Sequence, residues 1–146
     1  MQKRKKKGGK KKNRNKKLDK ETIMKKEERD ELLWKIQMTE DVDTIIEISK
    51  HEDPDIRLRA LKQLCPCKVQ KDIDAFWERI VEMVDDPNDE VRLRVLHNLC
   101  DGSPPHMEFE VKDALEKLKS DPNNEIRKRA NRVLASYLRT GKWNIL

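Results

Sequence analysis

The sequence "DDPNDEVRLRVLHNLC" (Asp85–Cys100) has a near copy on each side of it along the chain. Upstream stands "HEDPDIRLRALKQLC" (His51–Cys65), and downstream stands "SDPNNEIRKRANRVLA" (Ser120–Ala135). Equivalent positions in the three copies recur every 35 residues, as Ile56, Val91 and Ile126 do. A constant period of about 20–50 residues predicts a stack of structural repeats.

Each structural repeat has the apolar spacing of two amphipathic helices. The repeated phrase covers the junction between these helices and the second helix. The second helix of the first unit carries Ile56, Ala60, Leu61 and Leu64 on one face, a spacing that suits 3.6 residues per turn. The Asp-Pro pair separates the two helices, because proline ends a helix and aspartate caps the start of the next. We therefore expect three helical hairpins, each too thin to bury its apolar face without its neighbours.

The bulk composition agrees with thin helical layers. Charged residues make up 42% of the chain and aromatic residues only 4%, a balance that argues against a sheet and favours helices with much exposed surface. No apolar run approaches the roughly 20 residues that span a bilayer, so we expect no membrane partner. An odd number of cysteines, three, does not suggest a disulfide framework and favours a reducing compartment, nuclear or cytoplasmic.

Positive charge is concentrated near the N-terminus. Residues 3–17 hold eleven lysines and arginines and no acid, whereas the chain as a whole has a net charge of +6, so the remainder carries −5. We predict that residues 1–17 are disordered and that residues 18–38 form one helix. Residues 39–146 form the repeat domain, with repeats at about 39–65, 72–100 and 107–139 and a C-terminal cap at 140–146.

The basic segment is the strongest functional signal in the sequence. It comprises Lys3, Arg4, Lys5, Lys6, Lys7, Lys10, Lys11, Lys12, Arg14, Lys16 and Lys17. Such a run attracts the phosphates of nucleic acids and also has the composition of a nuclear-import signal. A solubilising segment without a dedicated partner is the alternative.

The repeated phrase resembles the HEAT-like family of armadillo-type α-solenoids. The resemblance rests on "DP…[IV]R" followed by apolar residues and a leucine, three times between residues 39 and 137. It implies a short superhelix of about three helical hairpins. It also implies a ladder of ion pairs between neighbouring repeats, formed by Asp53, Arg57, Asp86, Arg92, Asp121 and Arg127.

Residues that suggest a chemical site are few. Cys65, Cys67, His97 and Cys100 are weak candidates for zinc ligands, because zinc takes four sulfur or nitrogen ligands. Their spacing matches no familiar zinc motif, so we expect no cofactor and interpret the cysteines as packing residues. No nucleophile, acid–base pair or phosphate-binding glycine loop stands out, and we expect no enzymatic activity.

The function that these features favour is a non-catalytic scaffold. The second helices would hold a protein partner, and the basic segment would attach to nucleic acid or direct nuclear import. The alternative is a nucleic-acid-binding protein that uses the basic segment and a basic last repeat without reading sequence. A metal-dependent or nucleic-acid-modifying enzyme is the third and weakest hypothesis.

Trp77 is predicted to lie in the core, and Trp34 and Trp143 to cap the two ends of the stack.

Overall fold

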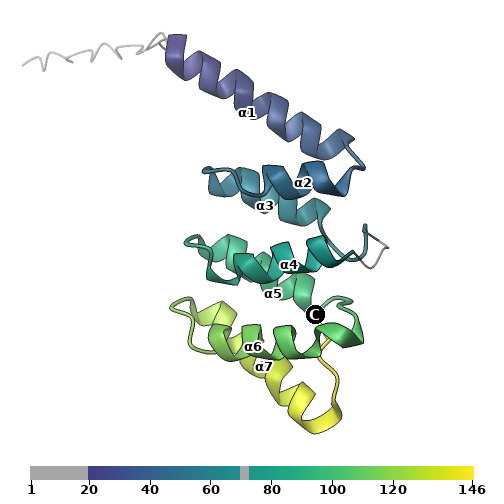
Figure 1. Ribbon diagram of the computed structural model, residues 1–146. Coiled ribbons are helices and arrows are strands. Elements are labelled where there is room, and N and C mark those ends of the chain that lie inside the picture. Colours follow the sequence, from purple (N-terminus) through teal and green to yellow (C-terminus); the bar gives the residue numbers. More distant parts are fainter. Residues whose placement is uncertain (1–19, 70–72) are drawn as a thin grey trace, which may run out of the picture.

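The computed structural model describes residues 20–69 and 73–146, and all regular structure in these residues is helical (Figure 1). The seven α-helices are α1 (Lys20–Met38), α2 (Val42–Ile48), α3 (Pro54–Gln63), α4 (Asp74–Glu82), α5 (Asp89–Leu99), α6 (Glu108–Leu118) and α7 (Asn124–Thr140). Short 3-10 turns follow α4 (Met83–Asp85) and precede α6 (Pro105–Met107). The all-α prediction is confirmed for this part of the chain, whereas the disorder predicted for residues 1–17 concerns residues outside it.

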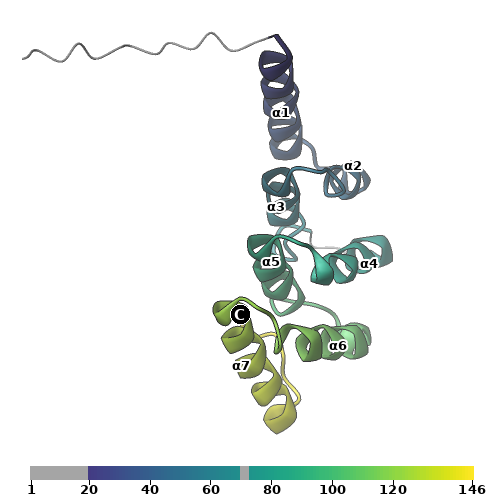
Figure 2. The ribbon, with the colours of Figure 1, turned by 90° about the vertical axis from the view of Figure 1, so that its left-hand side faces the viewer.

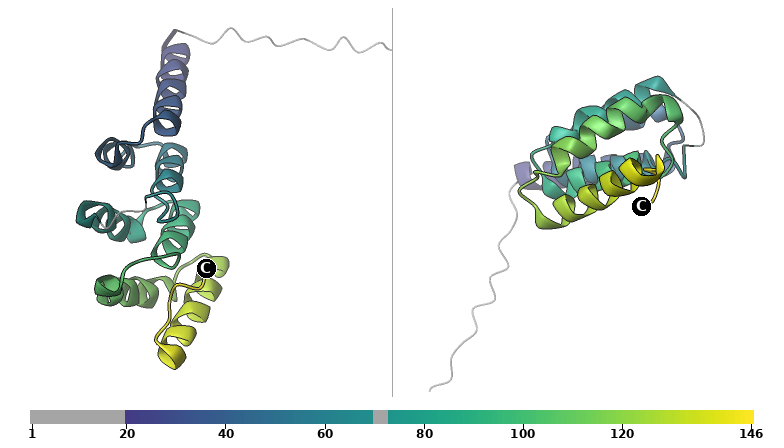
Figure 3. Two further views of the ribbon diagram at one scale, coloured as in Figure 1. Left: turned by 90° about the vertical axis from the view of Figure 1, so that its right-hand side faces the viewer. Right: turned by 90° about the horizontal axis from the view of Figure 1, so that it is seen from below.

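The helices form two columns (Figure 2). One column contains α1, α3, α5 and α7, and the other contains α2, α4 and α6. Each helix of the first column contacts the next one, and α2, α4 and α6 pack beside them in the order of the chain (Figure 3). The turns that lead into α3, α5 and α7 all lie on the same side of the stack (Figure 1). The three helices therefore run in the same direction.

The core lies between the two columns. Ile56, Val91 and Ile126, which share one position of the 35-residue period, are completely buried. Phe76 and Trp77 of α4 are also buried, and their rings meet edge to face with centroids 4.6 Å apart. Burying a large apolar side chain contributes about 1.5–3 kcal/mol to folding. The core therefore depends on contacts between helical pairs, as the period indicates.

The N-terminal ends of the first-column helices α3, α5 and α7 differ from the expectation in one respect. Asp53 caps α3 and Pro54 is its first residue, as predicted. At α5 and α7 the capping residues are Asn88 and Asn123, whose side chains accept hydrogen bonds from backbone N–H groups in the first turn. The two extra residues of these copies, relative to the first copy, bring an asparagine into the capping position that Asp53 holds.

α1 extends the first column by one helix. Ile36 is buried against Ile48 and Ile56, so α1 packs on the hairpin formed by α2 and α3. The predicted capping role of Trp34 is wrong, because 64% of its surface is exposed. Two residues correspond to roughly 200° around a helix. Trp34 therefore points away from the face on which Ile36 is buried.

The C-terminal residues fold back, but not over the end of the stack. Trp143 is buried, and its indole Nε1 donates to the Ser103 hydroxyl over 2.6 Å. The Asn144 side chain accepts from the backbone N–H of Gly102, and the Leu146 N–H donates to the Cys100 carbonyl. These bonds place residues 143–146 on the connection between α5 and α6, beside the stack. The predicted end cap at 140–146 is corrected accordingly.

Candidate functional site

Buried ion pairs join consecutive helical hairpins. The Arg57 guanidinium of α3 donates through Nε and Nη2 to the two carboxylate oxygens of Asp86, both over 2.8 Å. Its Nη1 donates to the backbone carbonyls of His51 and Glu52. The side chains of Arg57 and Asp86 are only 10% and 6% exposed. This geometry fixes the turn before α5 against the N-terminal half of α3.

The same arrangement recurs one repeat later. Arg92 of α5 donates to both carboxylate oxygens of Asp121 over 2.7 and 2.9 Å. Its Nη1 donates to the Asp86 carbonyl. The hydrogen bonds from Arg92 lower the pKa of the Asp121 carboxyl, and those to Asp121 raise the pKa of the Arg92 guanidinium. Both groups are therefore ionised over the ordinary pH range.

The two ends of this ladder differ from its predicted form. In the 35-residue register, Asp86 and Asp121 align with His51, whose Nδ1 accepts from the Asp53 N–H over 3.0 Å. Asp53 instead accepts from Arg29 of α1, a partner that the sequence analysis missed. At the other end, the Nη1 of Arg127 donates to the carbonyls of Asp121 and Pro122. No further aspartate follows Arg127 in the described chain to continue the series.

A shallow groove crosses α3, α5 and α7 on the outer side of the first column. It has a volume of about 490 Å³ and is lined by Leu58, Lys62, Asp89, Glu90, Leu93, Arg94, His97, Asn123, Glu125 and Arg129. Leu58 and Leu93 are half-buried and sit at equivalent positions of α3 and α5. The groove therefore has an apolar strip, formed by Leu58 and Leu93, with charged side chains around it.

Charge in the groove follows the direction of the helices. The acids Asp89, Glu90 and Glu125 lie in the first turns of α5 and α7, where the helix dipole favours negative charge. The cations Arg94 and Arg129 lie one turn further on. Because the three helices are parallel, one edge of the groove is acidic and the other is basic. Part of this charge is neutralised internally, since Arg129 contacts Glu125 through a 2.5 Å ion pair.

The Nε atom of Arg94 is the one buried side-chain nitrogen or oxygen atom of this groove that lacks a hydrogen-bond partner within the described chain. It is buried without a hydrogen-bond partner, although the rest of the side chain is half-buried. A buried donor without a partner costs about 1–3 kcal/mol. Because the Nε atom is covered by protein, a molecule in the groove would meet only the part of the Arg94 side chain that is not buried.

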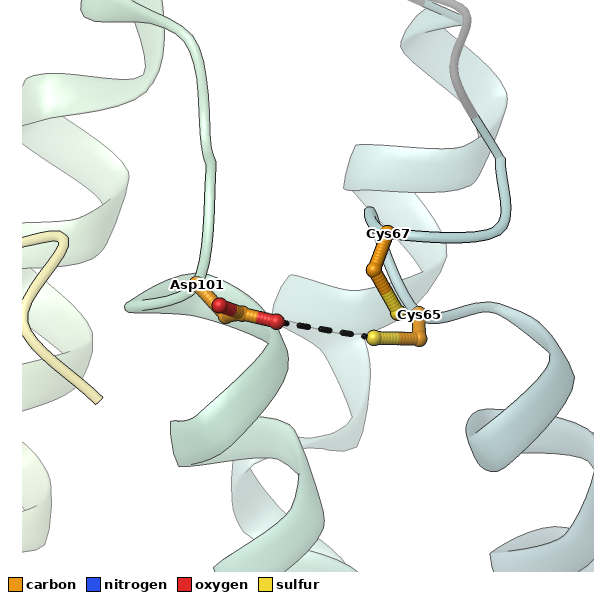
Figure 4. Close-up of side chains that lie close together, drawn as sticks. All are labelled: Cys65, Cys67 and Asp101. Atoms are coloured by element: carbon orange, nitrogen blue, oxygen red, sulfur yellow. Dashed lines mark hydrogen bonds between the residues drawn. The ribbon is translucent and has the colours of Figure 1, made fainter.

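Of the four predicted metal-ligand candidates, the structure brings together two. Cys65 and Cys67 gather with Asp101, with their ligand atoms within 4.8 Å of one another (Figure 4). The Nε2 atom of His97 lies 3.4 Å from Asp101 Oδ2. Cys100 does not belong to the cluster; it is completely buried, and burial raises the pKa of its thiol to about 12. Asp101 was missed because its proximity to Cys65 arises only when α3 and α5 pack together.

The other predicted site residues are the basic N-terminal segment and the basic side chains of the last hairpin. All residues of the basic segment, from Lys3 to Lys17, lie outside the described chain. In the last hairpin, Lys128, Arg132, Arg139 and Lys142 are exposed. Arg127 and Arg129, in contrast, are held by backbone carbonyls and by Glu125. The local basic character of this end therefore rests on four side chains rather than six.

Comparisons with protein-family models, with curated proteins and with solved structures found no match to this chain. Among the helices that the structure describes, none is long and apolar enough to cross a membrane.

Proposed function

We propose that this chain is a HEAT-like repeat scaffold that binds a segment of a partner protein in the groove across α3, α5 and α7. One observation carries this proposal: the groove has an apolar strip, Leu58 and Leu93, surrounded by charged side chains. The groove runs across three parallel helices and is open to solvent. Stacked repeats commonly use such extended surfaces for binding. The chain acts by holding its partner and carries out no reaction.

The charge pattern indicates what the partner segment looks like. Apolar side chains would lie on Leu58 and Leu93, because this strip is the apolar part of the groove floor. Basic side chains would face Asp89 and Glu90, and an acidic side chain would face the positively charged Arg94. An amphipathic helix with one acidic and one basic flank satisfies all three conditions.

The basic N-terminal segment gives the scaffold a second attachment. Eleven positive charges within residues 3–17 attract phosphates at moderate salt, and the attraction falls steeply as salt rises. We therefore propose that the segment recruits the scaffold to nucleic acid or to a nuclear-import receptor. The groove then presents the protein partner at that location.

A pull-down with matched variants tests the groove. The intact chain is used as bait beside Leu93→Arg and Arg129→Glu, which alter the groove, and Phe109→Arg, which alters an exposed apolar residue of α6 in the other column. Partners that are retained by wild type and Phe109→Arg but lost from both groove variants are then purified and titrated. Circular dichroism shows whether each variant is folded. Equal loss in Phe109→Arg, or full retention in both groove variants, would refute the proposal.

The alternative is sequence-independent nucleic-acid binding by the basic segment together with Lys128, Arg132, Arg139 and Lys142. The exposure of these four side chains on one hairpin favours it. Deleting residues 2–17 separates the two hypotheses. The scaffold proposal predicts that DNA and RNA binding is lost with the segment, whereas persistent binding with a steep salt dependence would show that the folded domain is the binder.

A further inference from the structure

The cluster of Cys65, Cys67 and Asp101 has the composition of a metal site. Cys65 and Cys67 follow α3, and Asp101 follows α5, so the three residues lie at equivalent ends of neighbouring hairpins. Figure 4 shows the two cysteine side chains directed toward each other and the Cys65 sulfur facing the Asp101 carboxylate. The Cys65 thiol donates to Asp101 Oδ2 over 3.6 Å.

A tight turn explains how cysteines only two positions apart can share one ion. The N–H groups of Lys68 and Val69 both donate to the Cys65 carbonyl, which curls the chain directly after α3. This turn brings the Cys67 side chain back beside Cys65. The ligand atoms of the two cysteines and Asp101 therefore lie within 4.8 Å of one another.

The separation of the Cys65 sulfur and the Asp101 carboxylate agrees with zinc coordination. With zinc–sulfur bonds of about 2.3 Å and zinc–oxygen or zinc–nitrogen bonds of about 2.0 Å, neighbouring ligand atoms lie roughly 3.3–3.8 Å apart. The separation of 3.6 Å between Cys65 Sγ and Asp101 Oδ2 lies in that range. His97 Nε2 lies 3.4 Å from the same carboxylate oxygen, but it does not belong to the group whose ligand atoms lie within 4.8 Å of one another.

The charges also favour a divalent ion. Two thiolates and one carboxylate carry three negative charges, and a divalent cation leaves one. The Arg94 guanidinium is close enough to act electrostatically on both Cys65 and His97, and it compensates that remaining charge.

We propose that Cys65, Cys67 and Asp101 bind a zinc ion that joins the C-terminal ends of α3 and α5, with His97 beside the Asp101 carboxylate. Binding replaces the thiol protons with bonds to the ion and releases the protons to solvent. The ion would add a link between two hairpins that already share a buried contact, the Asn98 side chain donating to the carbonyls of Leu61 and Leu64. His97 lies 3.4 Å from Asp101 and lines the groove, so the site adjoins one wall of the binding surface.

Titration of the full chain with Co²⁺ tests the site. The protein is first stripped with a chelator under a phosphine reductant, so that the cysteines are thiols. The expected result is one equivalent of Co²⁺ with the visible bands of tetrahedral geometry and a thiolate charge-transfer band, both removed by Zn²⁺. Cys67→Ser is the decisive variant because Cys67 is exposed and its replacement leaves the core intact. It should lose the charge-transfer intensity and most of the affinity, and Asp101→Asn should weaken binding.

Cys100→Ala is the matched control, because alanine already stands at the equivalent position 135. It should retain the wild-type spectrum. Thermal unfolding gives a second readout: Zn²⁺ should raise the Tm of wild type and Cys100→Ala but not that of Cys67→Ser. Absence of a tetrahedral Co²⁺ spectrum in wild type would overturn the proposal. So would binding that survives Cys67→Ser unchanged, or binding that requires Cys100.

Discussion

Removal of the Asp86 carboxylate should destabilise the stack strongly. In Asp86→Ala, the Nε and Nη2 donors of Arg57 lose both acceptors while remaining in a site where the arginine side chain is only 10% exposed. Breaking a buried ion pair by removing one partner costs about 3–5 kcal/mol. A domain of this size has a total stability of about 5–15 kcal/mol, so the variant should unfold at a much lower urea concentration.

A double-mutant cycle isolates the pair from other losses. Asp86 also accepts from the Asn88 N–H, and a single substitution removes that bond as well. The cycle of Arg57→Ala, Asp86→Ala and the double variant, measured by urea unfolding, should give a coupling free energy of about 2–3 kcal/mol. The same cycle on Glu125 and Arg129 serves as control, because their side chains are 56% and 41% exposed. An exposed i,i+4 pair should give about 0.3–0.5 kcal/mol.

Two results would refute this reasoning. One is a coupling free energy for Arg57 and Asp86 no larger than that for Glu125 and Arg129. The other is an Asp86→Ala variant whose stability lies within about 0.5 kcal/mol of wild type, as is usual for surface substitutions. Either result would mean that the ladder does not hold neighbouring hairpins together.

Three further predictions concern other parts of the stack. Leu96→Ala, at a completely buried position of α5, should lower the free energy of unfolding by about 2–5 kcal/mol in urea; a loss below 1 kcal/mol would contradict the packing described. Trp143→Ala should cost about 3–5 kcal/mol in the same assay, whereas Trp34→Ala, at a residue that is 64% exposed, should stay within about 0.5 kcal/mol of wild type. Because Arg92 lowers the pKa of Asp121 below its ordinary value of 3.8, the stability that this carboxylate provides is present above that pH and is lost as the pH falls through the lowered pKa. The difference in unfolding free energy between wild type and Asp121→Asn should therefore shrink on acidification, and a difference that stays constant into strong acid would contradict the ion pair.

The helices were predictable because their evidence is local or periodic. Ile56, Val91 and Ile126 repeat at one interval, and their burial follows from a 3.6-residue period that any reader of the sequence can count. The ladder was predictable in its central members from the family resemblance. Its first aspartate, Asp53, was chosen because it belongs to an Asp-Pro pair. In the 35-residue register, however, the residue equivalent to Asp86 is His51 and not Asp53.

The remaining features depend on contacts between segments that the sequence does not align. Arg29 belongs to no repeat, and its bond with Asp53 exists only because α1 stacks on α3. Asp101 meets Cys65 across 36 positions of the sequence, where no spacing rule applies. Trp143 looked like an end cap because it is apolar and terminal. The hydrogen bond from its indole to Ser103 decides its actual location.

Amide hydrogen exchange of the chain with and without its protein partner would test the binding surface most directly. The partner is one identified by the pull-down and purified. Our account predicts that binding slows exchange in α3, α5 and α7 around Leu58, Leu93 and Arg129, with little change in α2, α4 and α6. Protection confined to α2, α4 and α6, or to the basic N-terminal segment, would contradict the claim that the groove is the binding surface.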